Sequence, residues 1–353
     1  MVTFVKGVEL ATVHYGESSS VFLQNLAQAD TAGQSLTYVS AIALTEQEVV
    51  AYNEGQFGPS AKAPTVPLAA VYPKEGTLIS DNPFVVLNAS WVSPEQKAAA
   101  ADLLAYLLAP AQQAKLQAAG YRDAQGRAAV SSRDLGTIAT QPKTVIKPPV
   151  GSVLDKLQAS WWTVRKPARV LIIVDVSGSM DEQVVPGATK LDLVKAALLA
   201  AIDQVGDDDE VGLWSFSDQH QQLVPINRVG AQRAQLKTAV ASLQANGGTL
   251  LYSTVHDGWD YVSKSADPTH INAVVVMTDG QDNHSPGGAL SALTDALAKQ
   301  PEGAAVRVFT VAYGHDADKS DLGLIAQASR GQAYDASDPT LIRQVFLAVL
   351  SNF

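Results

Sequence analysis

Short runs of Val and Ile alternate with helix-like stretches throughout the second half of the chain. A continuous apolar run bounded by Gly or Asp is typical of a strand that is buried on both faces, and parallel sheets are built from such strands. The alternation therefore predicts an α/β fold with a doubly wound, mostly parallel sheet. The strand-like runs span 169–176, 211–217, 272–278 and 306–312, and the helix-like stretches span 190–205, 231–243, 252–262, 288–299 and 341–350.

Oxygen-bearing side chains follow two of these predicted strands. Asp175, Ser177 and Ser179 stand at the end of the first run, and Asp279 directly follows the third. Thr249 lies in a Gly-Gly-Thr turn between them in the chain. Ligands of doubly wound sheets bind beyond the carboxyl ends of the strands. The sequence therefore predicts that these five residues meet at one edge of the sheet.

The residue types in this set suit a hard divalent cation. Mg²⁺ prefers six oxygen ligands, keeps some of its waters and usually takes one or two carboxylates from the protein. Hydroxyl ligands fill coordination positions without neutralising the ion, so the metal would retain positive charge. We expect Mg²⁺, with Mn²⁺ as the alternative, and an open coordination position that favours an acidic ligand from outside.

The same residues resemble the von Willebrand factor type A (VWA) family, in which a DxSxS motif, a loop Thr and a later Asp form the metal-ion-dependent adhesion site. The resemblance covers residues 167–353 and includes VVVMTDGQDN (274–283) and VFTVAYGHDAD (308–318), which are typical of bacterial members. It implies a Rossmann-like fold and a non-enzymatic, adhesion-type module that binds Mg²⁺. It also implies that a Glu or Asp carboxylate of a partner protein completes the metal shell.

Enzymatic interpretations find less support in the residues. Neither serine of the motif lies in GxSxG, and HExxH and GxxxxGK[ST] are absent from the sequence. An aspartyl-phosphate enzyme would use Asp175 as nucleophile, but such enzymes usually carry a second acid where this chain has Ser177. His256, His284 and His315 are expected to be structural or solvated. The sequence therefore predicts a protein that is not an enzyme.

The first 145 residues follow a different pattern, in which helices are marked by their caps. Thr45-Glu46-Gln47-Glu48 and Ser93-Pro94-Glu95-Gln96 predict capping boxes, and the segments 67–73 and 83–87 are predicted to be strands. The stretch 94–122 resembles the later part of a bacterial type 2 extracellular solute-binding protein. That resemblance implies an α/β domain with part of a periplasmic-binding-protein fold, too short for a complete two-lobed solute cleft.

Pro and Gly residues mark a connection between the two parts. The stretch 122–150 is polar and broken by both residue types, so we place the first domain at 1–145, a linker and junction helix at 146–166, and the VWA domain at 167–353. The junction helix is expected over 152–164. It carries Trp161 and Trp162, which are expected to pack at the junction or, alternatively, to form an exposed partner-binding pair.

Charge and composition narrow the choice of partners. The formal net charge of −10 argues against nucleic acid as a partner. The acidic run 207–210 is expected to be a solvated loop, with a calcium site as the alternative. No apolar stretch reaches the length of a membrane span, and the first seven residues lack the pattern of a signal peptide. The absence of cysteine excludes disulfides and thiolate metal sites.

Two other functions stay open at this stage. In the first, the chain is a solute-binding or transport-associated protein that acts through residues 1–145, with a small-molecule solute as ligand. In the second, it is an intracellular VWA subunit of an ATPase-linked complex. The family resemblances imply an extracytoplasmic or cell-surface location, whereas the N-terminus as it stands implies the cytoplasm.

Overall fold

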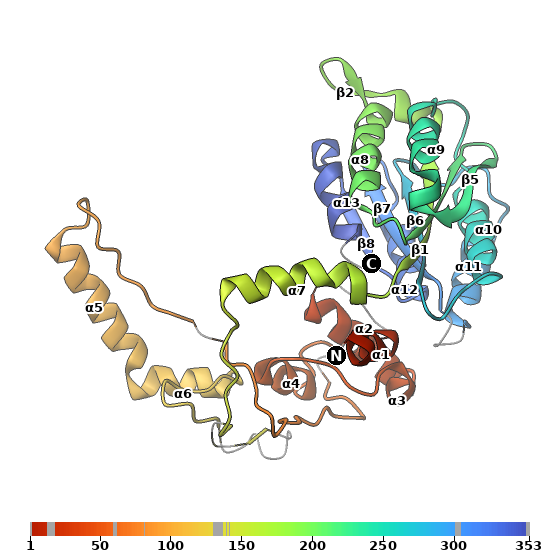
Figure 1. Ribbon diagram of the computed structural model, residues 1–353. Helices are drawn as coiled ribbons and strands as arrows, with labels where there is room; N and C mark the ends of the chain where they lie inside the picture. The colour runs from red at the N-terminus through yellow and green to blue at the C-terminus, as the bar shows by residue number, and fades with distance from the viewer. Residues whose placement is uncertain are drawn as a thin grey trace. The chain divides into compact units, whose positions relative to one another are not determined.

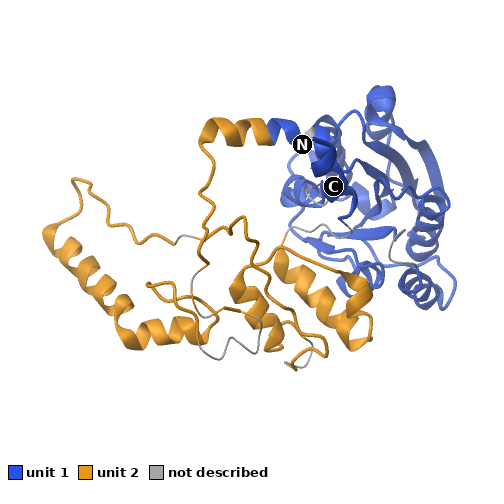
Figure 2. Cartoon of the chain, turned by 60° about the horizontal axis from the view of Figure 1, so that its bottom comes forward, with its two compact units in different colours: residues 1–17, 158–353 blue, residues 18–157 orange. Residues whose placement is uncertain are grey.

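The computed structural model describes residues 2–12, 18–58, 62–80, 82–129, 137–138, 140, 142–300 and 305–350. The chain divides into two compact units (Figure 2). Unit 1 comprises residues 1–17 and 158–353, and unit 2 comprises residues 18–157. Within the described ranges, none of the helices combines the length and the apolar character that crossing a membrane requires.

Unit 1 is built on a six-stranded sheet with the order β5-β4-β1-β6-β7-β8 (Figure 1). All neighbouring strands are parallel except β4 and β5, which are antiparallel. This confirms the predicted fold class. The strands are β1 (Ala168–Asp175), β4 (Glu210–Phe216), β5 (His220–Arg228), β6 (Ile271–Thr278), β7 (Arg307–Tyr313) and β8 (Ala333–Ala336), and a separate hairpin pairs β2 (Gln183–Val185) with β3 (Ala188–Thr189).

Helices cover both faces of this sheet, because its central strands are apolar on both sides. In β1, Val170 and Val174 pack into one core, while Leu171 and Ile173 pack into the other. The first core lies under α8 (Lys190–Gln204), α9 (Val229–Ala241) and α13 (Ile342–Leu350), and the second lies under α10 (Leu251–Ser263), α11 (Ala289–Ala298) and α12 (Lys319–Ala328) (Figure 1). The remaining elements of unit 1 are α1 (Val2–Leu10), which packs few side chains, and the 3₁₀ helices η2 (Gly178–Asp181) and η4 (Pro339–Leu341).

The two edges of the sheet differ from its centre. The strand β5 carries Pro225, and its pairing with β4 shifts register between Val211 and Trp214. Several of its residues, including Gln221 and Gln222, are exposed. At the other edge, β8 has only four residues. Neither edge offers a long, regular apolar strand.

The regular elements in the described part of unit 2 are helices, and two of them begin at the predicted caps. The capping box at Thr45 and Glu48 opens α4, and the one at Ser93 and Gln96 opens α5. A small core includes Leu23, Tyr38 and Tyr52, whereas α5 and α6 contain no buried residue. The helices are α2 (Ser19–Thr31), α3 (Ser35–Tyr38), α4 (Glu46–Asn53), α5 (Pro94–Leu108) and α6 (Pro110–Ala118).

The strands predicted at 67–73 and 83–87 were wrong, since neither segment is a strand. Side chains bind the backbone near the first segment in place of a neighbouring strand. The Asp30 carboxylate accepts hydrogen bonds from the backbone of Thr65 and Val66 at 2.6 and 3.0 Å. The Asn53 side chain binds both backbone groups of Leu68. In the second segment the apolar residues are exposed and no strand of the described chain lies beside them.

The junction helix is present as α7 (Gly151–Val164), which spans the point where the two units divide. Trp161 is 45% exposed, and the side chain of Trp162 lies outside what the structure describes, as do residues 130–136 of the polar stretch 122–150. The domain boundaries at 145 and 167 and the solute-binding resemblance of the first 145 residues stay predictions.

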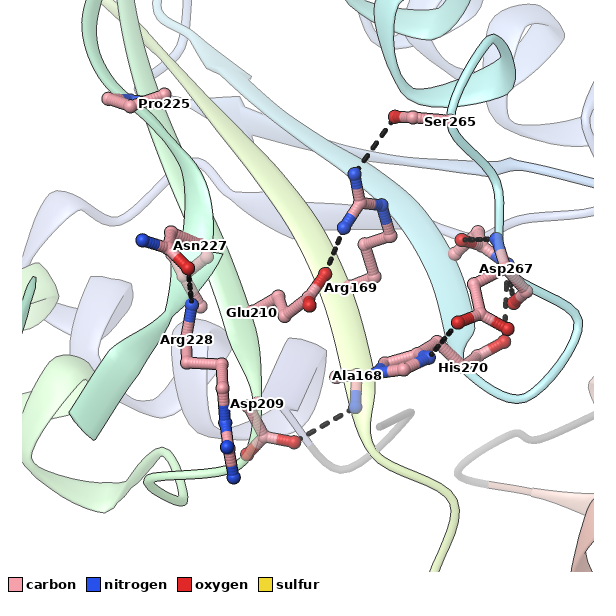
Figure 3. A network of polar contacts seen from close by, with 12 residues as sticks. Ala168, Arg169, Asp209, Glu210, Pro225, Asn227, Arg228, Ser265, Asp267 and His270 are labelled. Carbon is pink, nitrogen blue, oxygen red and sulfur yellow. Dashed lines mark hydrogen bonds and ion pairs between the residues drawn. The ribbon is translucent and has the colours of Figure 1, made fainter. Parts of the chain in front are cut away.

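The acidic residues 207–210 are paired with arginines, and Figure 3 shows the pair of Glu210 with Arg169. The expectation of a solvated loop holds for the exposed Asp207 and Asp208 but was wrong for Asp209, which is 2% exposed. Asp209 accepts a hydrogen bond from the Ala168 backbone at 2.9 Å and so fixes the start of β1. A calcium site gains no support, because each carboxylate already faces its own guanidinium: Asp207 faces Arg233, Asp208 faces Arg228, Asp209 faces Arg165 and Glu210 faces Arg169.

Candidate functional site

The two predicted carboxylate ligands lie side by side at the carboxyl ends of neighbouring strands. In the parallel pairing of β1 with β6, Val174 lies opposite Met277, so Asp175 ends its strand beside Thr278 and Asp279 follows. Both aspartates are completely buried. The sheet topology therefore brings together two residues that are 104 positions apart in the chain.

The two serines of the DxSxS motif lie within reach of these carboxylates. The backbone N–H of Ser177 donates to Asp175 Oδ1 at 2.7 Å, which closes a tight turn after β1. The Ser177 and Ser179 hydroxyl oxygens are 3.0 Å apart, and the Ser179 hydroxyl donates to Asp279 Oδ1 at 2.7 Å. Four of the five predicted residues thus form one continuous polar chain.

Thr249 reaches the same place through its loop. The backbone of Gly247 accepts a hydrogen bond from Gly178 at 3.0 Å, which ties the Thr249 loop to the serine loop. The Thr249 hydroxyl lies beside Gly280, where a Cβ atom would be 3.4 Å from it. Asn283 forms hydrogen bonds with both backbone groups of Thr249. Its Oδ1 accepts from the Thr249 N–H at 2.9 Å, and its own N–H donates to the Thr249 carbonyl at 3.1 Å.

Gly247 and Gly248 allow this loop to approach its neighbours closely. Gly247 has a φ of +84°, in the left-handed region that favours glycine. At Gly248, a Cβ would lie 2.2 Å from His284 Cε1, and the N–H donates to Asp218 Oδ1 at 2.6 Å. The Gly-Gly-Thr sequence is therefore a steric requirement of the loop that carries Thr249.

Asp175 is held by a residue that we did not select from the sequence. The Thr278 hydroxyl donates to Asp175 Oδ2 at 2.5 Å and accepts from the Gly280 N–H at 3.2 Å. Burial raises the pKa of Asp175 to about 6, despite the hydrogen bonds from Thr278 and Ser177 that lower it. Sequence reasoning treated Thr278 only as the last residue of a strand.

Lys190 is the second residue that the sequence alone did not reveal. Its ammonium lies 2.9 Å from Asp279 Oδ2 and 2.6 Å from Glu182 Oε2, and the residue is only 3% exposed. Burial by itself lowers the pKa of Lys190, but its hydrogen bonds to Asp279 and Glu182 raise that pKa above its usual value, so the side chain is charged. The only signal in the sequence was a Lys at the start of a predicted helix.

A cavity of about 550 Å³ opens beside this cluster. Its lining includes Ser179, Asp279, His315, Asp316 and Lys319. Of the three histidines considered in the sequence, His315 lines this cavity. His284 instead lies 3.3 Å from Asp218 and His256 lies 3.3 Å from Asp257, so these two histidines pair with carboxylates outside the cluster.

The donor set has the chemistry that Mg²⁺ or Mn²⁺ requires. It offers two carboxylates and three hydroxyls, all oxygen atoms, which matches the preference of Mg²⁺ for few carboxylates and retained waters. Within the described residues, no group of three or more His, Cys, Asp or Glu is arranged to hold a metal.

A doubly wound sheet with helices on both faces and a polar cluster at the carboxyl ends of its strands defines a Rossmann-like α/β protein. Residues 170–347 match the von Willebrand factor type A domain family, and the chain belongs to this family. Domains of this family generally act as non-enzymatic protein-interaction modules, so the fold supports a protein-interaction role in general.

The chain is similar to several proteins, and the matches cover different shares of its length. An uncharacterised protein of Mycobacterium tuberculosis is 27% identical over 310 residues, which cover 83% of this chain and 43% of the relative. An uncharacterised protein of Synechocystis is 25% identical over 186 residues, covering 52% of this chain and 41% of the relative. The chain thus spans less than half the length of these relatives. The mycobacterial match extends beyond residues 170–347 into the N-terminal part.

Among solved structures, a von Willebrand factor type A protein from Catenulispora acidiphila is 25% identical with a TM-score of 0.46, covering 54% of this chain and 43% of that chain.

Proposed function

We propose that unit 1 is a divalent-metal-dependent protein-binding module. Asp175, Ser177, Ser179, Thr249 and Asp279 hold Mg²⁺, or Mn²⁺ in its place, directly or through water. The metal supplies positive charge at the mouth of the site. An acidic residue of a partner protein completes the coordination shell, which makes recognition reversible by chelation.

The observation that carries this proposal is the convergence of the five oxygen-bearing side chains at one sheet edge. Two further features support it. The cavity of about 550 Å³ beside Asp279 and Ser179 is large enough for a partner side chain. The Ser179 side chain is exposed, whereas Asp175 and Asp279 are buried, so a metal at this cluster would be reached from the solvent side. The extracytoplasmic or cell-surface location stays a prediction.

Thermal unfolding of the full chain with Mg²⁺, Mn²⁺, Ca²⁺ or EDTA tests the metal step. A ligand that binds only the folded state stabilises it by about 2.7 kcal/mol at a hundred times its Kd. For a domain of this size that gain corresponds to roughly 5–10 °C in Tm. We expect this rise with Mg²⁺ or Mn²⁺, its loss in Asp279→Asn, and its retention in Asp203→Asn. Asp203 on α8 is a matched control because it forms an exposed ion pair with Lys237 on α9.

Selection of displayed peptides on the immobilised full chain tests the partner step. In Mg²⁺ we expect enrichment of peptides with an Asp or Glu at a fixed position, and elution of these peptides by EDTA. The same peptides retained in EDTA, or retained by Asp279→Asn, would refute metal-dependent recognition even if the metal itself binds.

A further inference from the structure

A buried ammonium lies against one of the proposed metal ligands. Lys190 Nζ is 2.9 Å from Asp279 Oδ2. Lys190 is only 3% exposed and Asp279 is completely buried. The second partner of the ammonium, Glu182, has a side chain that is 60% exposed, so solvent screens much of its charge. Glu182 lies nearer to the ammonium, at 2.6 Å, but the buried ion pair is Lys190 with Asp279.

The surrounding fold holds Lys190 in this position. Its N–H donates to the Glu182 carbonyl at 2.9 Å, and its carbonyl accepts from the Tyr313 hydroxyl at 3.1 Å. The side chain passes Gly314, where a Cβ would lie 3.4 Å from Lys190 Cε. Lys190 is also the first residue of α8, whose start is fixed by the capping box of Thr189. This pair is a built part of the domain and not a chance contact of two mobile side chains.

Both oxygens of Asp279 have partners without any metal. Oδ1 accepts from the Ser179 hydroxyl at 2.7 Å, and Oδ2 faces the Lys190 ammonium. Removing the counter-ion of a buried carboxylate strongly destabilises the folded state. Lys190 therefore supplies the counter-charge that a metal would otherwise provide, so the domain can remain folded without a metal.

The formal charges show what this ammonium does to a bound metal. Asp175, Asp279 and Lys190 together carry one net negative charge, from two carboxylates and one ammonium. A divalent cation changes this to one net positive charge, and a single carboxylate from a partner brings it to zero. Without the ammonium, the two aspartates would neutralise the cation by themselves.

We propose that Lys190 is a positioning residue that acts as a tethered counter-ion of Asp279, weakens divalent-metal binding in the free protein and thereby couples metal retention to an anionic partner. This inference rests on the proposed metal-dependent function. It adds that the charges of the free protein themselves keep its metal affinity low. It also identifies the residue that makes the partner's carboxylate necessary.

The test compares Lys190→Met and Lys190→Arg in the full chain, with Mn²⁺ as the only added ligand. Calorimetry should show Mn²⁺ binding at least tenfold tighter in Lys190→Met than in the natural protein, and unchanged within about threefold in Lys190→Arg. In EDTA, Lys190→Met should have a lower Tm, and saturating Mn²⁺ should remove most of that difference. Folding of Lys190→Met only in the presence of Mn²⁺ would be the same result in its strongest form.

Lys190→Gln covers the case in which the Met variant is unfolded under every condition. Its amide can still donate to Asp279 but carries no charge, so its Mn²⁺ affinity should also rise. Glu182→Gln removes the exposed partner and should leave the affinity for Mn²⁺ within about twofold. If the natural protein binds Mn²⁺ and neither uncharged variant binds it more tightly, this inference is refuted while the metal site stands. If none of these proteins binds Mn²⁺, both proposals are refuted.

Discussion

Replacement of Thr278 by Val tests how much the hydrogen bond from Thr278 to Asp175 stabilises the domain. The hydroxyl of Thr278 donates to Asp175 Oδ2 at 2.5 Å, and both residues are completely buried. Valine has nearly the same shape, so the substitution opens no cavity but removes both hydrogen bonds of the hydroxyl, the one to Asp175 and the one from the Gly280 N–H. Asp175 Oδ2 then loses its side-chain donor in a place that solvent does not reach.

The expected cost follows from that loss. A hydrogen bond to a charged group contributes about 1.5–3 kcal/mol, and a buried acceptor left without its donor bears the full cost of desolvation. We therefore expect Thr278→Val to lower the free energy of unfolding by about 2 kcal/mol, which is roughly 4–8 °C in Tm for a domain of this size. The measurement is thermal unfolding of the full chain in EDTA at neutral pH, so that no metal contributes.

A threonine on the surface provides the matched control. Thr238 in α9 is exposed, and its hydroxyl donates to the Ala234 carbonyl of its own helix at 2.9 Å. Thr238→Val should change Tm by no more than about 1–2 °C, because water replaces the lost partner and the exposed substitution costs only about 0.5 kcal/mol. Equal Tm shifts in the two variants would refute the reasoning, because they would show that the Thr278 hydroxyl does not support Asp175 at the end of β1.

Two further substitutions test the loop geometry and the core of unit 2. Gly248→Ala should lower Tm by roughly 2–4 °C, because the new Cβ would lie 2.2 Å from the half-exposed His284 ring, which must move at a cost of about 1 kcal/mol. The control Gly287→Ala has no atom within 4 Å of its Cβ and should leave Tm unchanged. Equal changes in Tm in the two variants would contradict the steric argument. Glu46→Gln should increase hydrogen exchange across residues 18–157 at pH 7 but not at pH values below the folded pKa of Glu46. Burial raises the pKa of Glu46, but the hydrogen bonds from Arg122 and Tyr72 outweigh burial and hold this pKa below its usual 4.5. The stabilisation by the Glu46–Arg122 ion pair is therefore present above about pH 4.5 and is lost as the pH falls through the folded pKa. A difference in exchange that persists in strong acid would exclude the Glu46–Arg122 ion pair as its cause.

The sequence predicted the centre of the fold well, because local pattern and tertiary environment agree there. The strands β1 and β6 are apolar on both faces and end at a polar residue, so their positions and their shared edge could be inferred from residues alone. The same is true of the helices that begin at Thr45 and Ser93, whose capping boxes depend only on residues three positions apart.

The sequence was less informative where the partner of a segment lies far away in the chain. The strand β5 was missed because its residues are polar and Pro225 interrupts them, and β8 was missed because it is so short. Segment 67–73 was predicted to be a strand from its apolar residues, but nothing local reveals that no strand lies beside it.

The candidate site shows the same division. Its five oxygen-bearing residues could be selected from motif and topology, and the structure brings them together. Lys190 and Thr278 could not be selected, because a lysine that begins a helix and a threonine that ends a strand are ordinary in sequence. Their importance comes from contacts with carboxylates 89 and 103 positions away.

The edges of the sheet in unit 1 affect how readily copies of this domain aggregate at high concentration. An exposed edge strand offers unpaired backbone groups to any other strand, which is the usual beginning of fibrous aggregation. Pro225 has no N–H to offer, the irregular pairing of β5 twists the strand away from a flat register, and the four residues of β8 are too few for a long ladder. Association through the backbone is therefore disfavoured at both edges of the sheet, which leaves contacts between side chains as the main way for copies of unit 1 to meet.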